Sequence, residues 1–466
     1  MRIIVPIFAY SSSLLHRISP RRITPVFFVI SLIFCTSVQA NIIRDTEIEY
    51  RLNRVSLPLA QQAGFTNGVK IRIVLDPSYN AFVVGRDVIY IHSGLLLDAE
   101  TDGEILGVIA HEIGHLAAGH VPRRDEARAN ASLATALTAL AAIASAASGQ
   151  AEAAAGIALG GTDRARRNYL ATSRHDEAVA DEWALSALDE AGMSATGLNQ
   201  LMRRLAGQRA LPESRQSAYY MTHPEPEDRL SSIEDHVRQS AHSNASLPQE
   251  AIADLWRVRA KLSGYSGLAL TRGLEQRLAA IDAPAAQDIA ALYKAYMNVI
   301  RAYRRGNLRE ASAQISALIA ADEADPFFHE LAGDIAFASG DIQSAADHYR
   351  TALRHLPQAP QIALSLGRAL VAGGQSSDLP EAIIQLQKAV RGEPNWAFAR
   401  RELGIAFGRN NQLAEAHLAL SEAALLSGQR TQAIQLAERA LRAEPLADDV
   451  AARARDILFQ LNQPLR

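Results

Sequence analysis

The chain contains the string His111-Glu112-Ile113-Gly114-His115, in which two histidines lie four residues apart with a glutamate beside the first. On a helix this spacing puts both imidazoles on one face, close enough to reach one metal ion. Glu112 then lies where a carboxylate can take a proton from a metal-activated water molecule and later give it to a leaving amine. The pattern predicts a hydrolase with one Zn²⁺ per chain, held in part by His111 and His115.

The residues around this motif predict that it lies inside a single helix. Thr101 and Glu104 fit a capping box at the start of the helix, apolar residues recur at helical spacing through the motif, and Val121-Pro122 would end the run. The two histidines are therefore expected to share one rigid element.

Two stretches before the motif have the alternating apolar and polar residues of strands. Lys70 to Leu75 predicts a short strand, and Ala81 to Ile91 predicts a hairpin that leads directly into the motif helix. An edge strand beside a protease site commonly accepts substrate backbone as an added strand, and Asn80 to Val84 is placed for that role. An ordinary hairpin of an α+β domain fits the same residues equally well.

A third ligand has to come from outside the motif helix. A zinc motif with all ligands on one helix would need glycine at position 118 and histidine at position 121, where the chain has Ala118 and Val121. His120 is out of phase with that pattern and is interpreted as an ordinary polar helix residue.

Residues 176–182 open a second helix, with Glu177 and Asp181 on one face. A carboxylate there could complete a His-His-Glu ligand set, while Asp181, one turn further on, could hold the free N–H of a ligand imidazole. His223 follows in a proline-rich loop, where it could hydrogen-bond substrate or cap the metal.

The N-terminal 40 residues have the features of an export signal. Arg21-Arg22 precede a short apolar run, and small residues up to Ala40 suit signal peptidase, so residues 1–40 are expected to be a cleaved signal peptide. An uncleaved anchor is the alternative. Cys35 is the only cysteine, so the mature chain would hold zinc through histidine and carboxylate alone.

Residues 129–151 carry no charged side chain and are rich in alanine, with serine, threonine and leucine. Alanine favours helices but is only weakly hydrophobic, so the stretch predicts a helical hairpin and not a membrane span. A buried or mobile helix and a surface that rests on a membrane or covers the site are both left open.

The C-terminal part has an internal repeat. Small and aromatic residues recur at the positions of a 34-residue helix-turn-helix repeat, and the first full unit shows Gly333, Ala345, Tyr349, Ala352 and Pro357. This register predicts a tetratricopeptide solenoid with a concave binding face. The net charge of −3 gives no electrostatic reason to expect nucleic acid as a partner.

The expected fold class is mainly α with a small β-sheet: an α+β zincin-type metallopeptidase domain followed by an α-helical tetratricopeptide-repeat solenoid. The expected domains are a signal peptide at 1–40, the metallopeptidase domain at 41–245, a helical connector at 246–285 and the repeat domain at 286–466.

The order of Asn80-Ala81-Phe82, H-E-I-G-H, the E-x-x-A-D of residues 177–181 and the T-H-P around His223 resembles the HtpX and CAAX-prenyl-protease family of zinc metallopeptidases. The resemblance runs from about residue 41 to residue 237. It implies His111, His115 and Glu177 as zinc ligands, Glu112 as the base and Asp181 as the group behind a ligand. Unlike the integral-membrane members, this chain shows no multi-span hydropathy.

The combination of an export signal, a peptidase domain of this family and following repeats resembles secreted members of the family, and this resemblance implies further properties. By resemblance, His223 is a fourth zinc ligand that keeps the site closed, and the repeats contact outer-membrane assembly machinery. His223 is thus expected either to regulate the site or to stabilise the transition state.

These patterns together predict a periplasmic zinc endopeptidase that acts on misassembled outer-membrane proteins, with possible peripheral contact to the membrane. The rival interpretation is a chaperone or assembly scaffold that binds clients through its repeats and rarely cuts them. A purely structural zinc site is disfavoured, because such sites are usually closed by cysteine and the mature chain would have none.

Overall fold

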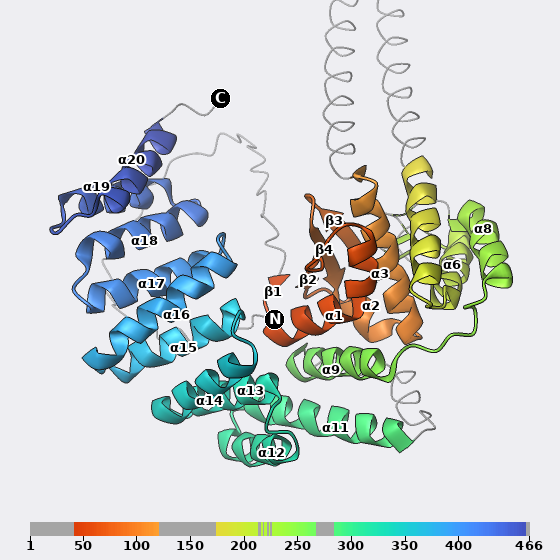
Figure 1. Cartoon of the computed structure of the whole chain (residues 1–466), viewed down its shortest axis with the longest axis horizontal. Coiled ribbons are helices and arrows are strands. Elements are labelled where there is room, and N and C mark those ends of the chain that lie inside the picture. Colours follow the sequence, from red (N-terminus) through yellow and green to blue (C-terminus); the bar gives the residue numbers. More distant parts are fainter. Residues whose placement is uncertain are drawn as a thin grey trace, which may run out of the picture. The chain divides into compact units, whose positions relative to one another are not determined.

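The computed structural model describes residues 42–120, 174–212, 216–217, 219–220, 223, 226–266 and 284–462 (Figure 1). The signal peptide expected at 1–40 and the alanine-rich stretch at 129–151 lie outside the described residues. Among the described helices, none is both long and apolar enough to cross a membrane.

A four-stranded sheet opens the fold, in the order β1-β2-β4-β3. The hairpin and the strand before it are confirmed: β3 and β4 pair antiparallel, and β2 pairs with β4 in parallel. β1 is short and pairs antiparallel with the end of β2. β3 is therefore an edge strand of the described sheet. The strands are β1 (Ile42–Ile43), β2 (Lys70–Val74), β3 (Ala81–Val84) and β4 (Val88–His92).

Helices pack around this sheet and share its apolar core. The core takes side chains from the sheet, from α1 and α3, and from the helical residues 174–190 that follow later in the chain. The helices of this part are α1 (Thr46–Gln62), α2 (Ser93–Asp98), α3 (Asp102–Ala117), α6 (Thr196–Ala206), the 3₁₀ turn η1 (Gly207–Ala210), α8 (Pro226–Gln239) and α9 (Gln249–Ser266).

α3 contains the whole H-E-x-x-H motif, as the sequence predicted. The Thr101 side chain accepts a hydrogen bond from the Glu104 backbone N–H and caps the start of the helix. The expected end at Val121-Pro122 was wrong, because α3 stops at Ala117. Gly119 adopts a positive φ of 66°, and this left-handed residue ends the helix as a C-terminal glycine does.

α3 and the helical residues 174–190 cross at a point where α3 has no side chain. A Cβ atom built on Gly114 would lie 2.6 Å from the Ala180 carbonyl oxygen. Real Cβ atoms essentially never come that close to backbone, so only glycine permits this separation. The crossing falls between the two histidines on one helix and between Glu177 and Asp181 on the other.

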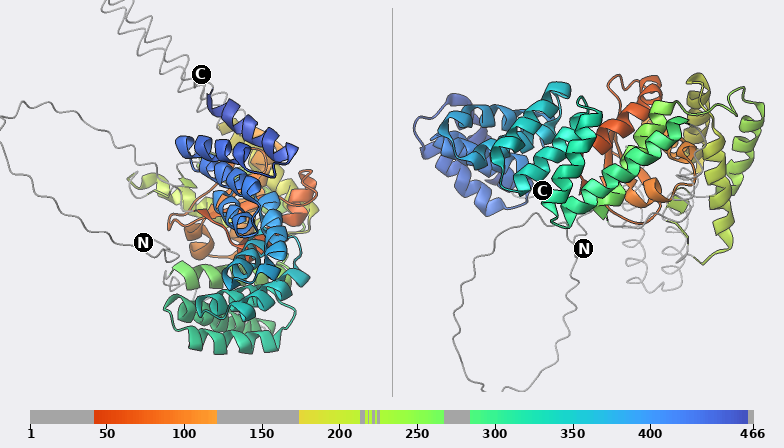
Figure 2. Two further views of the ribbon diagram at one scale, coloured as in Figure 1. Left: turned by 90° about the vertical axis from the view of Figure 1, so that its left-hand side faces the viewer. Right: turned by 90° about the horizontal axis from the view of Figure 1, so that it is seen from below.

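The second part of the fold consists of paired helices joined by short turns. Figures 1 and 2 show the helices from α11 to α20 following one another as packed neighbours. This arrangement confirms the expected fold class of a small sheet with helices followed by a helical repeat region. The elements are α11 (Pro284–Arg304), α12 (Leu308–Ala321), α13 (Pro326–Ala338), α14 (Ile342–His355), α15 (Pro360–Gly373), the 3₁₀ turn η3 (Ser376–Asp378), α16 (Leu379–Gly392), α17 (Ala397–Arg409), α18 (Leu413–Leu426), α19 (Arg430–Arg442) and α20 (Asp448–Asn462).

A buried ionic cluster joins α1 to α9 and α11. Glu47 is fully buried, pairs with Arg51 at 2.8 Å and with Arg257 at 2.6 Å, and accepts a 2.6 Å hydrogen bond from the Tyr296 hydroxyl. Burial alone would raise the pKa of Glu47, but Arg257, Arg51 and Lys261 outweigh it and hold that pKa far below its usual range. The carboxylate therefore stays charged, and three helices converge on it.

The glycine crossing gives a stability prediction. Gly114→Ala should lower the free energy of unfolding by about 1–3 kcal/mol, because the added methyl group would push against the Ala180 backbone. Gly103→Ala, in the first turn of α3, is the matched control, since its Cβ would meet only ordinary contacts at 3.4 Å. Urea unfolding measures both variants, and equal stability of the two would contradict the packing argument.

Candidate metal centre

α3 supplies three buried polar side chains to one site. His111 and Glu112 are fully buried and His115 is 1% exposed. The two imidazoles lie 4.7 Å apart between ring centroids, which follows from their separation of about one helical turn. In each ring, Nε2 is the nitrogen that faces Glu177.

The helical residues 174–190 supply the carboxylates. Glu177 Oε2 lies 3.2 Å from His111 Nε2, and Glu177 Oε1 lies 3.5 Å from His115 Nε2. Asp181, one turn further along, lies 2.9 Å from the other nitrogen of His111, Nδ1. The structure thus brings together the two acids that the sequence singled out, on opposite sides of the His111 ring.

His223 reaches the same place from the segment before α8. Its Nδ1 lies 2.9 Å from Glu177 Oε2 and 3.3 Å from His111 Nε2. Its Nε2 lies 3.3 Å from Glu112 Oε1. One possible ligand atom from each of His111, His115, Glu177 and His223 lies within 4.8 Å of the other three.

The chemistry of this group fits a metal ion. Burial holds the pKa of His115 well below its usual value, so this ring is neutral, and its Nε2 has no hydrogen-bond partner among the described residues. Burial would also lower the pKa of His111, but hydrogen bonds to Asp181 and Glu177 reverse the effect and raise it to about 9. Asp181 and Glu177 therefore stabilise positive charge beside His111, while His115 presents a neutral ring, which is the combination that a cation site needs.

Arg229 is a residue of the site that sequence reasoning missed. Its guanidinium donates to Asp181 Oδ1 at 2.7 Å and to Glu177 Oε2 at 3.0 Å. Burial alone would raise the pKa of Asp181, but Arg229 outweighs it and lowers that pKa to about 2. The sequence held one signal for it: Glu177 and Asp181 share a helix face, and two carboxylates that become buried together need a positively charged partner.

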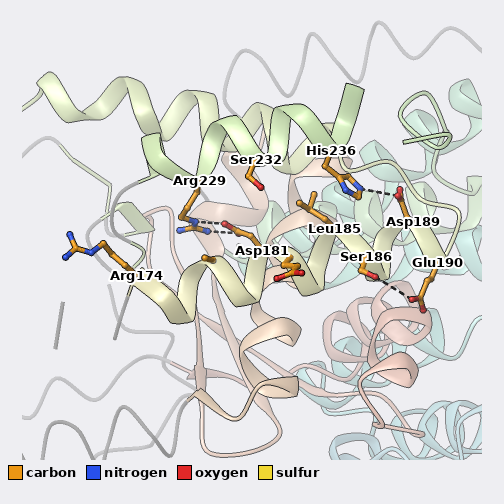
Figure 3. Close-up of a pocket in the computed structure, with 11 residues that line it drawn as sticks. Arg174, Asp181, Leu185, Ser186, Asp189, Glu190, Arg229, Ser232 and His236 are labelled. Carbon is orange, nitrogen blue, oxygen red and sulfur yellow. Dashed lines mark hydrogen bonds and ion pairs between the residues drawn. The ribbon is translucent and has the colours of Figure 1, made fainter. Parts of the chain in front are cut away.

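The Arg229–Asp181 pair borders a cavity of about 760 Å³ between the helical residues 174–190 and α8 (Figure 3). A second ion pair, between His236 and Asp189 at 3.1 Å, bridges the same two helices further along. These two pairs hold α8 against the helix that carries Glu177.

His120 does not fit the interpretation as an ordinary polar helix residue. It lies beyond the end of α3, is 1% exposed, and contacts the His115 ring. The positive φ of Gly119 ends α3 before His120 and changes the direction in which this side chain points, which the helix-favouring residues around it concealed.

Comparison with known proteins agrees with this geometry. Residues 47–237 match the model of peptidase family M48, and residues 296–360 and 330–397 match tetratricopeptide repeat models. Residues 47–237 are therefore a metallopeptidase domain of family M48, and tetratricopeptide repeats follow it in the chain. The resemblance drawn from the motifs is confirmed.

The whole chain resembles one particular kind of protein, the β-barrel assembly-enhancing protease. The protein of that name from Escherichia coli strain K12 is 25% identical over 437 residues, covering 91% of this chain and 85% of that protein. The metalloprotease LoiP of the same strain is 31% identical over 176 residues, covering 36% of this chain and 63% of LoiP. A Vibrio cholerae relative is 31% identical over 169 residues, covering 36% of this chain and 34% of that protein.

Removal of the buried arginine tests the electrostatics of the site. Arg229→Met should lower the free energy of unfolding of the metal-free protein by about 3–5 kcal/mol, because two carboxylates lose a buried partner. The control is Arg203→Met on α6, which breaks an exposed ion pair with Glu234 on α8. This change should lower the free energy of unfolding by no more than about 1 kcal/mol.

Urea unfolding with and without zinc measures both effects. Zinc should restore part of the stability lost in Arg229→Met, because a divalent cation replaces the missing positive charge beside Glu177. Equal losses in the two variants would rule out the buried pair as a main support of the site.

Proposed function

We propose that this metallopeptidase is a periplasmic zinc endopeptidase that hydrolyses misassembled outer-membrane proteins and assists their assembly. The observation that carries the proposal is the buried group of His111, His115 and Glu177 with the Glu112 carboxylate beside it. The printed name of the relatives, β-barrel assembly-enhancing protease, supports the choice of substrate.

Zinc is the ion that this set of ligand atoms fits best. Imidazole nitrogens with a single carboxylate are the usual ligands of catalytic zinc, whereas calcium and magnesium prefer sites made only of oxygen. His111, His115 and Glu177 would hold one Zn²⁺ per chain. When bound, zinc would supply a Lewis acid for the peptide carbonyl and allow a water molecule to act as nucleophile near neutral pH.

Glu112 is the proposed general base. Its carboxylate lies on α3 between the two histidine ligands in sequence and is fully buried, so it faces a space from which bulk water is excluded. It would take a proton from the attacking water molecule and give it to the amine that leaves. Asp181 accepts the Nδ1–H of His111 and so keeps the Nε2 lone pair of that ring directed at the metal.

His223 is the proposed regulator. A catalytic zinc site needs one position for water or substrate, and the Nδ1 of His223 lies among the other ligand atoms where that position would be. Its Nε2 also contacts the base Glu112 at 3.3 Å. In this arrangement His223 would block the metal and the base together, and proteolysis would require it to move away. A role in stabilising the transition state is the alternative.

β3 is the proposed support for substrate backbone. It is an edge strand of the described sheet, and its first residue, Ala81, has its carbonyl oxygen 3.4 Å from His223 Nε2. An extended peptide that added to this edge would pass beside the metal ligands. The same movement of His223 that frees the metal would also free the Ala81 carbonyl.

The repeats are the proposed contact for protein partners. Repeat arrays of this kind present a concave surface, and we assign to it outer-membrane proteins and their assembly machinery. A chain with net charge −3 has no electrostatic bias toward nucleic acid. Residues 1–40 are proposed as a cleaved signal peptide. For residues 129–151, a buried helix, a cover over the site and a surface for peripheral membrane contact remain alternative predictions. The proposed domains are 41–245 for the peptidase, 246–285 for the connector and 286–466 for the repeats.

A chaperone or assembly scaffold is the second candidate. The position of His223 favours it, because an enzyme with a blocked metal and base would spend much of its time bound to clients without cutting them. Complementation of a deletion strain by Glu112→Gln separates the two, since a scaffold would still support outer-membrane assembly without hydrolysis.

Glu112→Gln tests the proposed base. The variant should retain zinc but hydrolyse casein at least about 100-fold more slowly than wild type, because the amide cannot accept the proton. Glu182→Gln, at an exposed position on the helix that carries Glu177, should behave as wild type. Metal analysis and casein digestion measure the result, and near-normal hydrolysis by metal-loaded Glu112→Gln would refute the role.

His223→Ala tests the proposed block. The variant should keep its zinc and digest casein several-fold faster than wild type, because the metal and Glu112 are both released. His355→Ala, at an exposed position on α14, is the control and should leave the rate unchanged. A slower rate in His223→Ala would assign this histidine to the transition state instead.

A further inference from the structure

The turn after α3 places a further histidine, His120, against the candidate metal centre. The Gly119 N–H donates to the Leu116 carbonyl at 3.1 Å, and its φ of 66° takes the backbone out of the helical path of α3. His120, the next residue, is 1% exposed, and its Nδ1 lies 2.8 Å from the Nδ1 of His115. The two rings are tilted by 67°, with centroids 5.1 Å apart.

The two facing nitrogens can carry only one proton between them when both rings are neutral. His115 directs its Nε2 at Glu177, so its lone pair for the metal is on Nε2 and its proton is on Nδ1. Among the described residues, the group placed to accept that proton is a lone pair on His120 Nδ1. His120 must then carry its own proton on Nε2.

The Nε2 of His120 faces a carboxylate. Asp176 Oδ1 lies 3.6 Å from it, and Asp176 is 2% exposed. Asp176 directly precedes the proposed ligand Glu177 on the same helix. Contact with this acid favours the tautomer of His120 that has its proton on Nε2, which is the tautomer that can accept from His115.

The geometry points to His120 as a positioning residue of the metal centre: it accepts the Nδ1–H of His115 and holds that ring with Nε2 directed at the ion. This inference rests on the proposed function, because it takes His115 to be a ligand. The two ligand histidines are thus supported differently. A carboxylate fixed by Arg229 holds His111, whereas the imidazole of His120, next to Asp176, holds His115.

Three substitutions separate the two contacts of His120. Asparagine can put its side-chain oxygen near the place of Nδ1 and still accept from His115. Glutamine reaches the place of Nε2 and keeps only the contact with Asp176, and phenylalanine keeps neither. His120→Phe and His120→Gln should raise the dissociation constant for Zn²⁺ about 10- to 100-fold, whereas His120→Asn should stay within about threefold of wild type.

Zinc competition between the full chain and a chromogenic chelator measures these constants, and the absorption spectrum of the Co²⁺-loaded protein reports whether the ligand geometry has changed. If His120 served only to fill space, the ring of phenylalanine would replace it. Zinc binding by His120→Phe equal to wild type therefore overturns the inference. Equal loss in His120→Asn and His120→Gln overturns it as well, and this pair decides the question should His120→Phe fail to fold.

His115→Ala distinguishes failure of the inference from failure of the proposed function. Loss of zinc in His115→Ala with normal binding in the His120 variants removes the role of His120 and leaves the metal site standing. Normal zinc binding by His115→Ala would contradict both the role of His120 and the proposed metal site. Gly119→Ala acts on the same contact through the backbone, since its methyl group meets no atom of the described residues within 4 Å and strains the positive φ. It should weaken zinc binding in the same direction as His120→Gln.

Discussion

The crossing of α3 over the helical residues 174–190 at Gly114 is the constraint on which the site depends. The candidate ligands His111, His115 and Glu177 come from two helices far apart in sequence. Their side-chain atoms meet because the backbones approach more closely than any Cβ at position 114 would allow. Ala180 provides the matching small surface on the other helix. Gly114, a motif residue with no chemical role, therefore sets the distance between the histidines on α3 and the acids on the other helix.

Once the helices are this close, electrostatics determines what the site can hold. Glu112, Glu177 and Asp181 are all buried, and Arg229 is the buried basic side chain that contacts the last two. Desolvated carboxylates without matching charge would be costly, so a divalent cation bound here would stabilise the arrangement of these side chains. Metal binding would then be coupled to the stability of the fold, because Glu177 would serve as a ligand and also pairs with the buried Arg229.

The sequence predicted those parts of the site that depend on spacing along one element. His111 and His115 were predicted from helical periodicity, as was the shared face of Glu177 and Asp181, and the hairpin before α3 followed from alternation. Arg229 was missed because its partners lie about 50 residues away and only tertiary packing brings α8 to them. His120 was misread because two alanines before Gly119 favour helix, and the left-handed turn that redirects the chain is a single-residue event.

One helix has an effect that extends over most of the molecule. α9 places Leu255, Val258 and Leu262 in the core of the peptidase sheet, while Trp256 and Ala260 pack with α11 and the first repeat helices. Its Arg257 also pairs with Glu47 on α1 and with Asp325 before α13. A protein built this way resists dissection by truncation, because a fragment that ends on either side of α9 exposes an apolar face and unpaired charges. The peptidase domain and the repeats therefore share one folding unit, and a displacement of the first repeat helices would be transmitted through α9 to the peptidase core.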